Sequence, residues 1–109
     1  MNKTIFIAEA GVNHNGKVMI AKKLIDVAKK ADADYVKFQI FKTDNLATKN
    51  SPLAEYQKIN IGKDTTQYNM LKKLELSNEQ HLSLIKYCKK KKIKYLASVF
   101  DTESLNFLK

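Results

Sequence analysis

The sequence predicts an α/β fold with a parallel sheet, because three apolar segments alternate with helical patterns along 109 residues. The apolar segments run over 4–10, 35–41 and 95–100, and each has the length of a strand. Strands that are joined through helices form right-handed βαβ units, in which the strands are parallel. No linker or low-complexity segment divides the chain, so we expect one small domain.

Helices are expected between these strands. Over 17–31 a stripe of apolar residues recurs at spacings of three and four, which predicts one buried helix face. A second helix is expected to begin at Ser77, whose hydroxyl and Gln80 have the spacing of a capping box. Its expected apolar stripe contains Leu82, Ile85 and Cys88. A short helix over 70–76 should precede it, and another should begin after Asp101.

The region between Lys42 and Tyr68 lacks clear periodicity and contains Pro52, the single proline, and Gly62. Loops of this length in a compact domain are usually functional lids or insertions. This one follows the carboxyl end of the second predicted strand, the edge at which α/β folds bind ligands. We therefore expect a functional loop here.

Composition limits the classes of partner and compartment. The net charge is +9, but all basic residues are lysine, and base recognition relies on the bidentate guanidinium group of arginine. The lysine run over 89–94 therefore indicates a solvated helix end rather than a nucleic-acid site. No apolar run is long enough to span a membrane, and no signal peptide is evident. With a single cysteine, Cys88, these features predict a cytoplasmic protein.

Polar residues interrupt the predicted strands at positions that share a face. In the segment YVKFQIF, Lys37 and Gln39 alternate with apolar residues. One interpretation is an edge strand with a solvated face. The other is the interior of a barrel, where Lys37 meets an anionic ligand. The second is favoured because Glu9 and Ser98 occupy similar places near the carboxyl ends of the other strands.

Other polar residues give weaker signals. His14 fits either a surface turn or the rim of a site, and Gly16 fits the turn into the first helix. His81 is expected on the surface of its helix, and Cys88 is expected in the core. No group of cysteine, histidine or carboxylate residues has the spacing of a metal site.

Four segments together carry a family resemblance: IAEAGVNHNG, DADYVKFQIFKTDNL, QYNMLKKLELS and YLASVFDTESLNFL. In this order they resemble the sialic acid synthase family, which makes nonulosonic acids such as N-acetylneuraminate and N,N'-diacetyllegionaminate. The resemblance implies a (β/α)₈ TIM barrel followed by an antifreeze-like domain, in a homodimeric transferase. Residues 1–109 would be the amino-terminal part of the barrel domain, about the first three βα units, with the remaining barrel and the antifreeze-like domain absent.

The resemblance also implies roles for individual residues. Glu9 would be catalytic, and Lys37, Ser98 and Gln39 would bind phosphoenolpyruvate. Asn13 and His14 would lie at the sugar or rim side of the site. The second substrate would be an N-acetylated aminosugar of the N-acetylmannosamine type.

A divalent metal, Mn²⁺ or Mg²⁺, is expected in the full-length enzyme, with its ligands beyond Lys109 and none bound by this chain. The chain alone is therefore expected to be inactive. Departures from the family pattern are Ser98, Val99, Ile40 and two residues at positions where glycines usually end helices, Asp32 and Lys92.

Two alternatives stay open at this point. One is another phosphoenolpyruvate-condensing synthase of keto sugar acids on the same barrel. The other is a stand-alone basic βαβ module that binds an acidic partner through its lysine surface.

Overall fold

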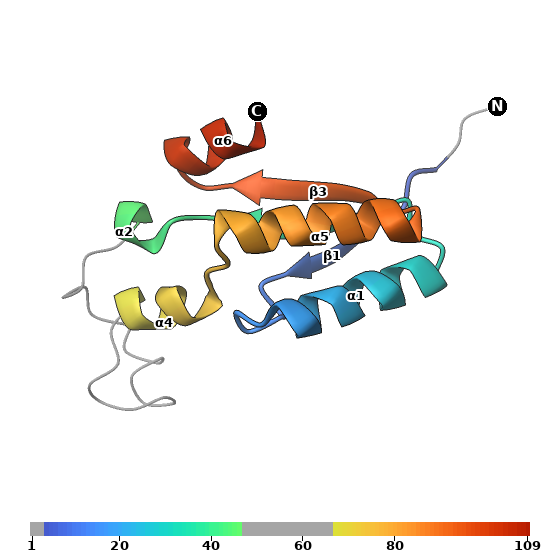
Figure 1. Cartoon of the computed structure of the whole chain (residues 1–109), viewed down its shortest axis with the longest axis horizontal. Helices are drawn as coiled ribbons and strands as arrows, with labels where there is room; N and C mark the ends of the chain where they lie inside the picture. The colour runs from blue at the N-terminus through green and yellow to red at the C-terminus, as the bar shows by residue number, and fades with distance from the viewer. Residues whose placement is uncertain (1–3, 47–66) are drawn as a thin grey trace.

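The computed structural model describes residues 4–46 and 67–109 (Figure 1). The described chain contains three strands and the helices that connect or follow them. In order, these elements are β1 (Ile7–Gly11), α1 (Val18–Lys30), β2 (Tyr35–Ile40), α2 (Thr43–Leu46), α4 (Gln67–Leu74), α5 (Asn78–Lys91), β3 (Lys94–Val99) and α6 (Thr102–Leu108). The strands form a parallel sheet in the order β1-β2-β3. The predicted α/β fold is therefore confirmed.

The strand β2 lies in the centre of the sheet, so its interpretation as an edge strand is wrong. Its residue Lys37 is in register with Glu9 on one side and Leu96 on the other. Gln39 is in register with Ser98. The polar residues that the sequence singled out therefore occupy neighbouring positions across three strands.

The helices α1 and α5 cover one face of the sheet (Figure 1). Apolar side chains from both helices and from alternate positions of β2 form the core there, and each large side chain that is fully buried contributes about 1.5–3 kcal/mol. The core residues are Ala10, Ala21, Ile25, Ala28, Ala33, Val36, Phe38, Leu76, Leu84, Cys88 and Ile93. Cys88 is 1% exposed, so its expected place in the core is confirmed.

The helix ends follow the predicted chemistry. Ser77 accepts a hydrogen bond from the Gln80 backbone N–H at 3.0 Å, and its own N–H donates to Gln80 Oε1 at 2.8 Å. This reciprocal pair is the predicted capping box. Asp32 and Lys92 both have φ of 62°, the left-handed conformation that glycine adopts most easily. The two non-glycine residues thus occupy true glycine-type positions.

Several element boundaries differ from the predicted ones. The first strand begins at Ile7 rather than at residue 4, and the Phe6 N–H donates instead to the Asp34 carboxylate at 2.9 Å. The helix predicted over 70–76 is α4, Gln67–Leu74, and the short helix α2 was not predicted. The rest of the predicted functional loop, 47–66 with Pro52 and Gly62, lies outside the described residues. In the parts that the structure describes, no helix is long and apolar enough to cross a membrane.

Candidate functional site

Four of the predicted site residues lie on the sheet face opposite α1 and α5. Along β2, Val36, Phe38 and Ile40 are completely buried, whereas Lys37 and Gln39 between them are only partly buried. Side chains alternate between the two faces of a strand, so Lys37 and Gln39 point away from the helices. Their registered neighbours Glu9, Leu96 and Ser98 share this face, which we call the open face. It carries the polar groups, and the covered face carries the core.

The pair Glu9 and Lys37 sits in the middle of the open face. The distance from Lys37 Nζ to Glu9 Oε1 is 3.8 Å, and the two side chains are 33% and 56% exposed. An ion pair with this much solvent exposure contributes little to stability. An ammonium group has three N–H donors, so Lys37 can keep this ion pair and still donate to an anion.

The second pair, Gln39 and Ser98, lies nearer the carboxyl edge of the sheet. Gly11, at the end of β1, has φ of +56°, and a Cβ there would lie 3.8 Å from Gln39 Nε2. The chain register is irregular between Glu9 and Gly11. This bulge brings the start of the loop after β1 beside the Gln39 amide. A hollow next to it is mainly apolar and is lined by Val12, Gln39, Phe41, Leu46, Leu71, Leu74 and Phe100.

The loop after β1 places Asn13 and His14 differently. Asn13 is exposed, as expected for a rim residue. His14 is 0% exposed, and its Nδ1 accepts a hydrogen bond from the Gly16 backbone N–H at 2.9 Å. The interpretation of His14 as a surface turn residue is therefore wrong. Gly16 does form the turn into α1, with φ of +74°, and a Cβ there would overlap with the Lys73 carbonyl oxygen.

The predicted surface position of His81 is also wrong. Its side chain is 1% exposed, and Nδ1 is 2.9 Å from the Tyr95 hydroxyl oxygen. Burial lowers the pKa of His81 to about 4, with smaller electrostatic contributions from the neighbouring His14 and Lys42.

The helical spacing explains this error. His81, Leu84 and Cys88 are separated by three and four residues, so they form one stripe, and all three are buried. The predicted stripe through Leu82 was shifted by one residue, and Leu82 is 47% exposed. The sequence contains this spacing, but a polar histidine is not expected in an apolar stripe.

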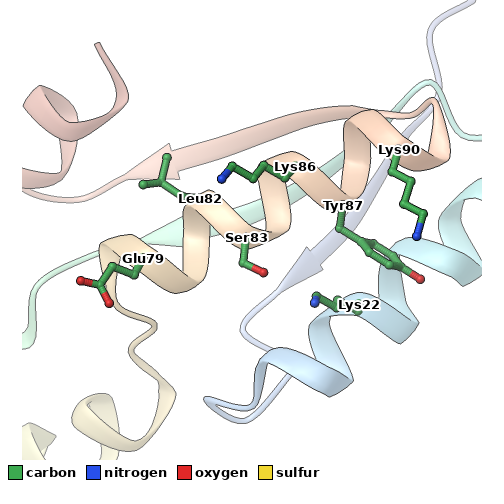
Figure 2. A pocket seen from close by; sticks show the side chains of 7 residues that line it. All are labelled: Lys22, Glu79, Leu82, Ser83, Lys86, Tyr87 and Lys90. Carbon is green, nitrogen blue, oxygen red and sulfur yellow. The ribbon is translucent and has the colours of Figure 1, made fainter.

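A separate groove lies between α1 and α5, on the covered side of the molecule (Figure 2). Figure 2 shows the Tyr87 ring reaching from α5 towards α1, where Lys22 lies. The Tyr87 hydroxyl donates to Asp26 at 2.7 Å, and Lys22 Nζ lies 5.4 Å from the ring centroid. None of the predicted site residues lines this groove, so it is separate from the open face.

The described residues do not hold a metal site by themselves. Within 4–46 and 67–109, no group of three or more histidine, cysteine, aspartate or glutamate residues could hold a metal ion. Both histidines are buried on the covered side. Glu9 is therefore the one carboxylate that the predicted site contributes from this part of the chain.

Comparison with known proteins assigns a family to this arrangement. The model of the NeuB family matches residues 24–109. The chain is 50% identical over 102 residues to N,N'-diacetyllegionaminic acid synthase of Legionella pneumophila, covering 94% of this chain and 29% of that protein. It is 46% identical over 108 residues to the enzyme of the same name from Campylobacter jejuni, covering 99% and 32%.

A solved structure agrees with this assignment. The crystal structure of N-acetylneuraminic acid (sialic acid) synthetase from Leptospira borgpetersenii in complex with citrate superposes with a TM-score of 0.75 at 31% identity. The match covers 98% of this chain and 33% of that one. The chain thus spans about a third of the length of its relatives, and its three βα units match the amino-terminal portion of their TIM barrel. This chain belongs to the NeuB family and corresponds to the amino-terminal portion of its relatives.

Proposed function

We propose that the whole protein containing this chain condenses phosphoenolpyruvate with an N-acetylated aminosugar to give a nonulosonic acid and phosphate. The observation that carries the proposal is the open face, where Glu9, Lys37, Gln39 and Ser98 lie in adjacent register positions of three parallel strands. The synthase names of the relatives support the same reaction class. Residues 1–109 would be the amino-terminal part of the barrel domain.

Charge and hydrogen bonding suit these residues to an anionic substrate. Lys37 supplies a positive charge on a central strand, and Ser98 and Gln39 supply a hydroxyl and an amide close by. Preorganised donors of this kind stabilise charge without reorganisation during the reaction. We assign the phosphoenolpyruvate anion to these three residues.

The proposed reaction forms one carbon–carbon bond. The vinyl carbon of phosphoenolpyruvate attacks the sugar aldehyde carbon, and water adds to the neighbouring carbon. The bond between that carbon and the phosphate oxygen then breaks, and phosphate leaves. Glu9, a carboxylate 3.8 Å from Lys37 Nζ, would exchange a proton with the attacking water or the sugar.

A divalent metal does not fit the described residues, because they lack a donor set of three. We therefore assign it no step here, and we propose that its ligands come from outside this part of the chain. We also propose that the whole protein is a cytoplasmic homodimer. The 109 residues alone should not turn over substrate, because three strands cannot close the eight-stranded barrel.

The reaction can be tested by following phosphate release and keto-acid formation. The whole protein would be incubated with phosphoenolpyruvate, Mn²⁺ and either N-acetylmannosamine, a 2,4-diacetamido sugar or an aldose phosphate. We expect product with an N-acetylated aminosugar only. Turnover of the aldose phosphate alone would assign the protein to a different keto-sugar-acid synthase class. Turnover by the 109-residue chain would contradict its proposed inactivity.

The role of Lys37 can be tested by substitution. Lys37→Met in the whole protein should raise the KM for phosphoenolpyruvate by roughly tenfold or more, since a charge-assisted hydrogen bond contributes about 1.5–3 kcal/mol. Lys23→Met, on the exposed surface of α1, removes the same charge away from the open face and serves as the matched control. Equal effects of the two substitutions would show that only net charge matters.

A further inference from the structure

Two buried histidines lie on the covered side, directly behind the candidate site. His14 and His81 are 0% and 1% exposed, and among the described residues neither buried Nε2 atom has a hydrogen-bond partner. Such buried polar atoms are uncommon, because leaving one unpaired costs about 1–3 kcal/mol. The bond that each ring makes through Nδ1 indicates what that ring holds in place.

Aromatic rings connect the two histidines across the sheet. The His14 ring centroid is 6.2 Å from that of Phe38, and Phe38 stacks on Tyr95 with centroids 5.8 Å apart. Tyr95 in turn meets the edge of His81 at 6.4 Å. The row runs from the loop after β1, across β2 and β3, to α5. Phe38, in its middle, lies between the two site residues Lys37 and Gln39 in the sequence.

The hydrogen bond of His14 defines its protonation. Because Nδ1 accepts the Gly16 N–H at 2.9 Å, a neutral His14 must carry its proton on Nε2. Burial lowers the pKa of His14, which favours this neutral form. The accepted bond spans the one stretch of the loop where two successive residues, Asn15 and Gly16, have positive φ, of 54° and 74°. The buried imidazole thus stabilises the turn at Asn15 and Gly16 through this hydrogen bond.

We propose that His14 is a positioning residue for the candidate site and does not contact substrate. It holds the loop of residues 12–16 in its tight conformation and anchors that loop to the ring row through Phe38. The exposed Asn13 is thereby fixed at the carboxyl edge of the sheet, one residue from the anchor. This inference rests on the proposed function for its ligand, but its structural part can be tested without ligand.

The test compares three variants of the whole protein that contains this chain. His14→Ala removes the acceptor for the Gly16 N–H. His14→Asn keeps an acceptor, because a short amide side chain can bond the backbone N–H two residues ahead. His81→Phe is the matched control, since it alters an equally buried ring of the same row but leaves the loop bond in place.

The first readouts are nitrogen chemical shifts of the imidazoles and hydrogen exchange of the Gly16 amide. We expect the Nε2–H tautomer for His14 at pH 7. In His14→Ala the Gly16 amide should exchange at least about tenfold faster, the equivalent of one lost hydrogen bond. His14→Asn should restore most of the protection, and His81→Phe should leave it unchanged. A charged His14, an Nδ1–H tautomer, or equal exchange in all variants would overturn the proposal.

The second readout is the binding of phosphoenolpyruvate, followed through the amide signals of Asn13 and Gln39. His14→Ala should weaken binding more than His81→Phe at a comparable loss of thermal stability. Equal weakening by both would reduce His14 to a core residue and reject positioning. If the unsubstituted whole protein binds no phosphoenolpyruvate, the proposed function fails, while Gly16 exchange still decides the role of His14 in the loop.

Discussion

The two faces of β2 serve different purposes although their residues alternate one by one. Val36, Phe38 and Ile40 are fully buried, the first two in the core under α1 and α5, whereas Lys37 and Gln39 between them lie on the open face. Successive residues of β2 thus alternate between side chains that stabilise the fold and side chains that face the candidate site. A substitution on the covered face of β2 should therefore affect folding, and a substitution of the next residue should affect binding.

The largest expected effect is on the covered face. Phe38→Ala should lower the free energy of unfolding by about 3–5 kcal/mol, because it leaves a cavity between His14 and Tyr95. Lys37→Ala, one residue earlier, should change it by less than about 1 kcal/mol, since its ion pair is solvent-exposed. Urea unfolding of both variants measures the difference. Similar losses at both positions would break the division between the faces.

A smaller loss of stability should occur at acid pH, and it arises from His81 on the covered face. The folded pKa of His81 is about 4, below its ordinary value of 6.5. The unfolded chain therefore binds a proton more readily, and the stability contribution is complete above pH 6.5 and is lost as the pH falls towards 4. The loss should be on the order of 2 kcal/mol. The groups that face His81 are His14, Lys42 and Tyr95, and no carboxylate is among those that shift its pKa.

Unfolding curves of the chain at pH 7 and pH 4.5 test this expectation. The variant His81→Phe lacks the titrating group, so its stability should depend less on pH over this interval. An unchanged pH dependence in the variant would assign the acid sensitivity to other groups, such as His14, whose pKa is also lowered by burial.

Much of the fold could be predicted from the sequence, because it rests on local patterns. The alternation in β2 and the capping box at Ser77 follow from spacing, and the glycine-type positions Asp32 and Lys92 follow from the family resemblance. The positions of Lys37 and Gln39 on a common face follow from the same alternation. Which residues lie beside Lys37 and Gln39 on β1 and β3 depends on the strand register, and the register depends on how the helices pack.

The errors concern polar residues that the fold buries. Polarity favours a surface turn or a site rim for His14 and a helix surface for His81, yet each is buried and has a specific hydrogen-bond partner. Those partners are Gly16, two residues away, and Tyr95, on a different element. His14 and Gly16 are only two residues apart, but no sequence preference marks a histidine that accepts a hydrogen bond from the second residue after it. The contact between His81 and Tyr95 depends on tertiary packing, which sequence spacing alone does not reveal.

The smallest expected effect lies at the edge of the sheet opposite the candidate site. Lys92 ends α5 with φ of 62° just before β3 begins, and its N–H donates to the Lys89 carbonyl oxygen at 3.2 Å. Lys92→Gly should raise the free energy of unfolding by about 1 kcal/mol, because glycine adopts this conformation without steric cost. Lys29 Nζ donates to the Lys92 backbone carbonyl, so that contact survives the substitution.

The control is Lys90→Gly, inside the last turn of α5, which makes the same change of side chain in a helical conformation. It should lower the free energy of unfolding by about 1 kcal/mol, since glycine disfavours helix interiors. The two variants carry the same charge, so opposite signs isolate the backbone effect. Because residue 92 lies at the amino-terminal end of β3 and Ser98 near its carboxyl end, Lys92→Gly should leave phosphoenolpyruvate binding unchanged. A change in binding would show that the two ends of the sheet are coupled. The separation of residues for stability from residues for binding would then hold between the two faces of the sheet but not between its two ends.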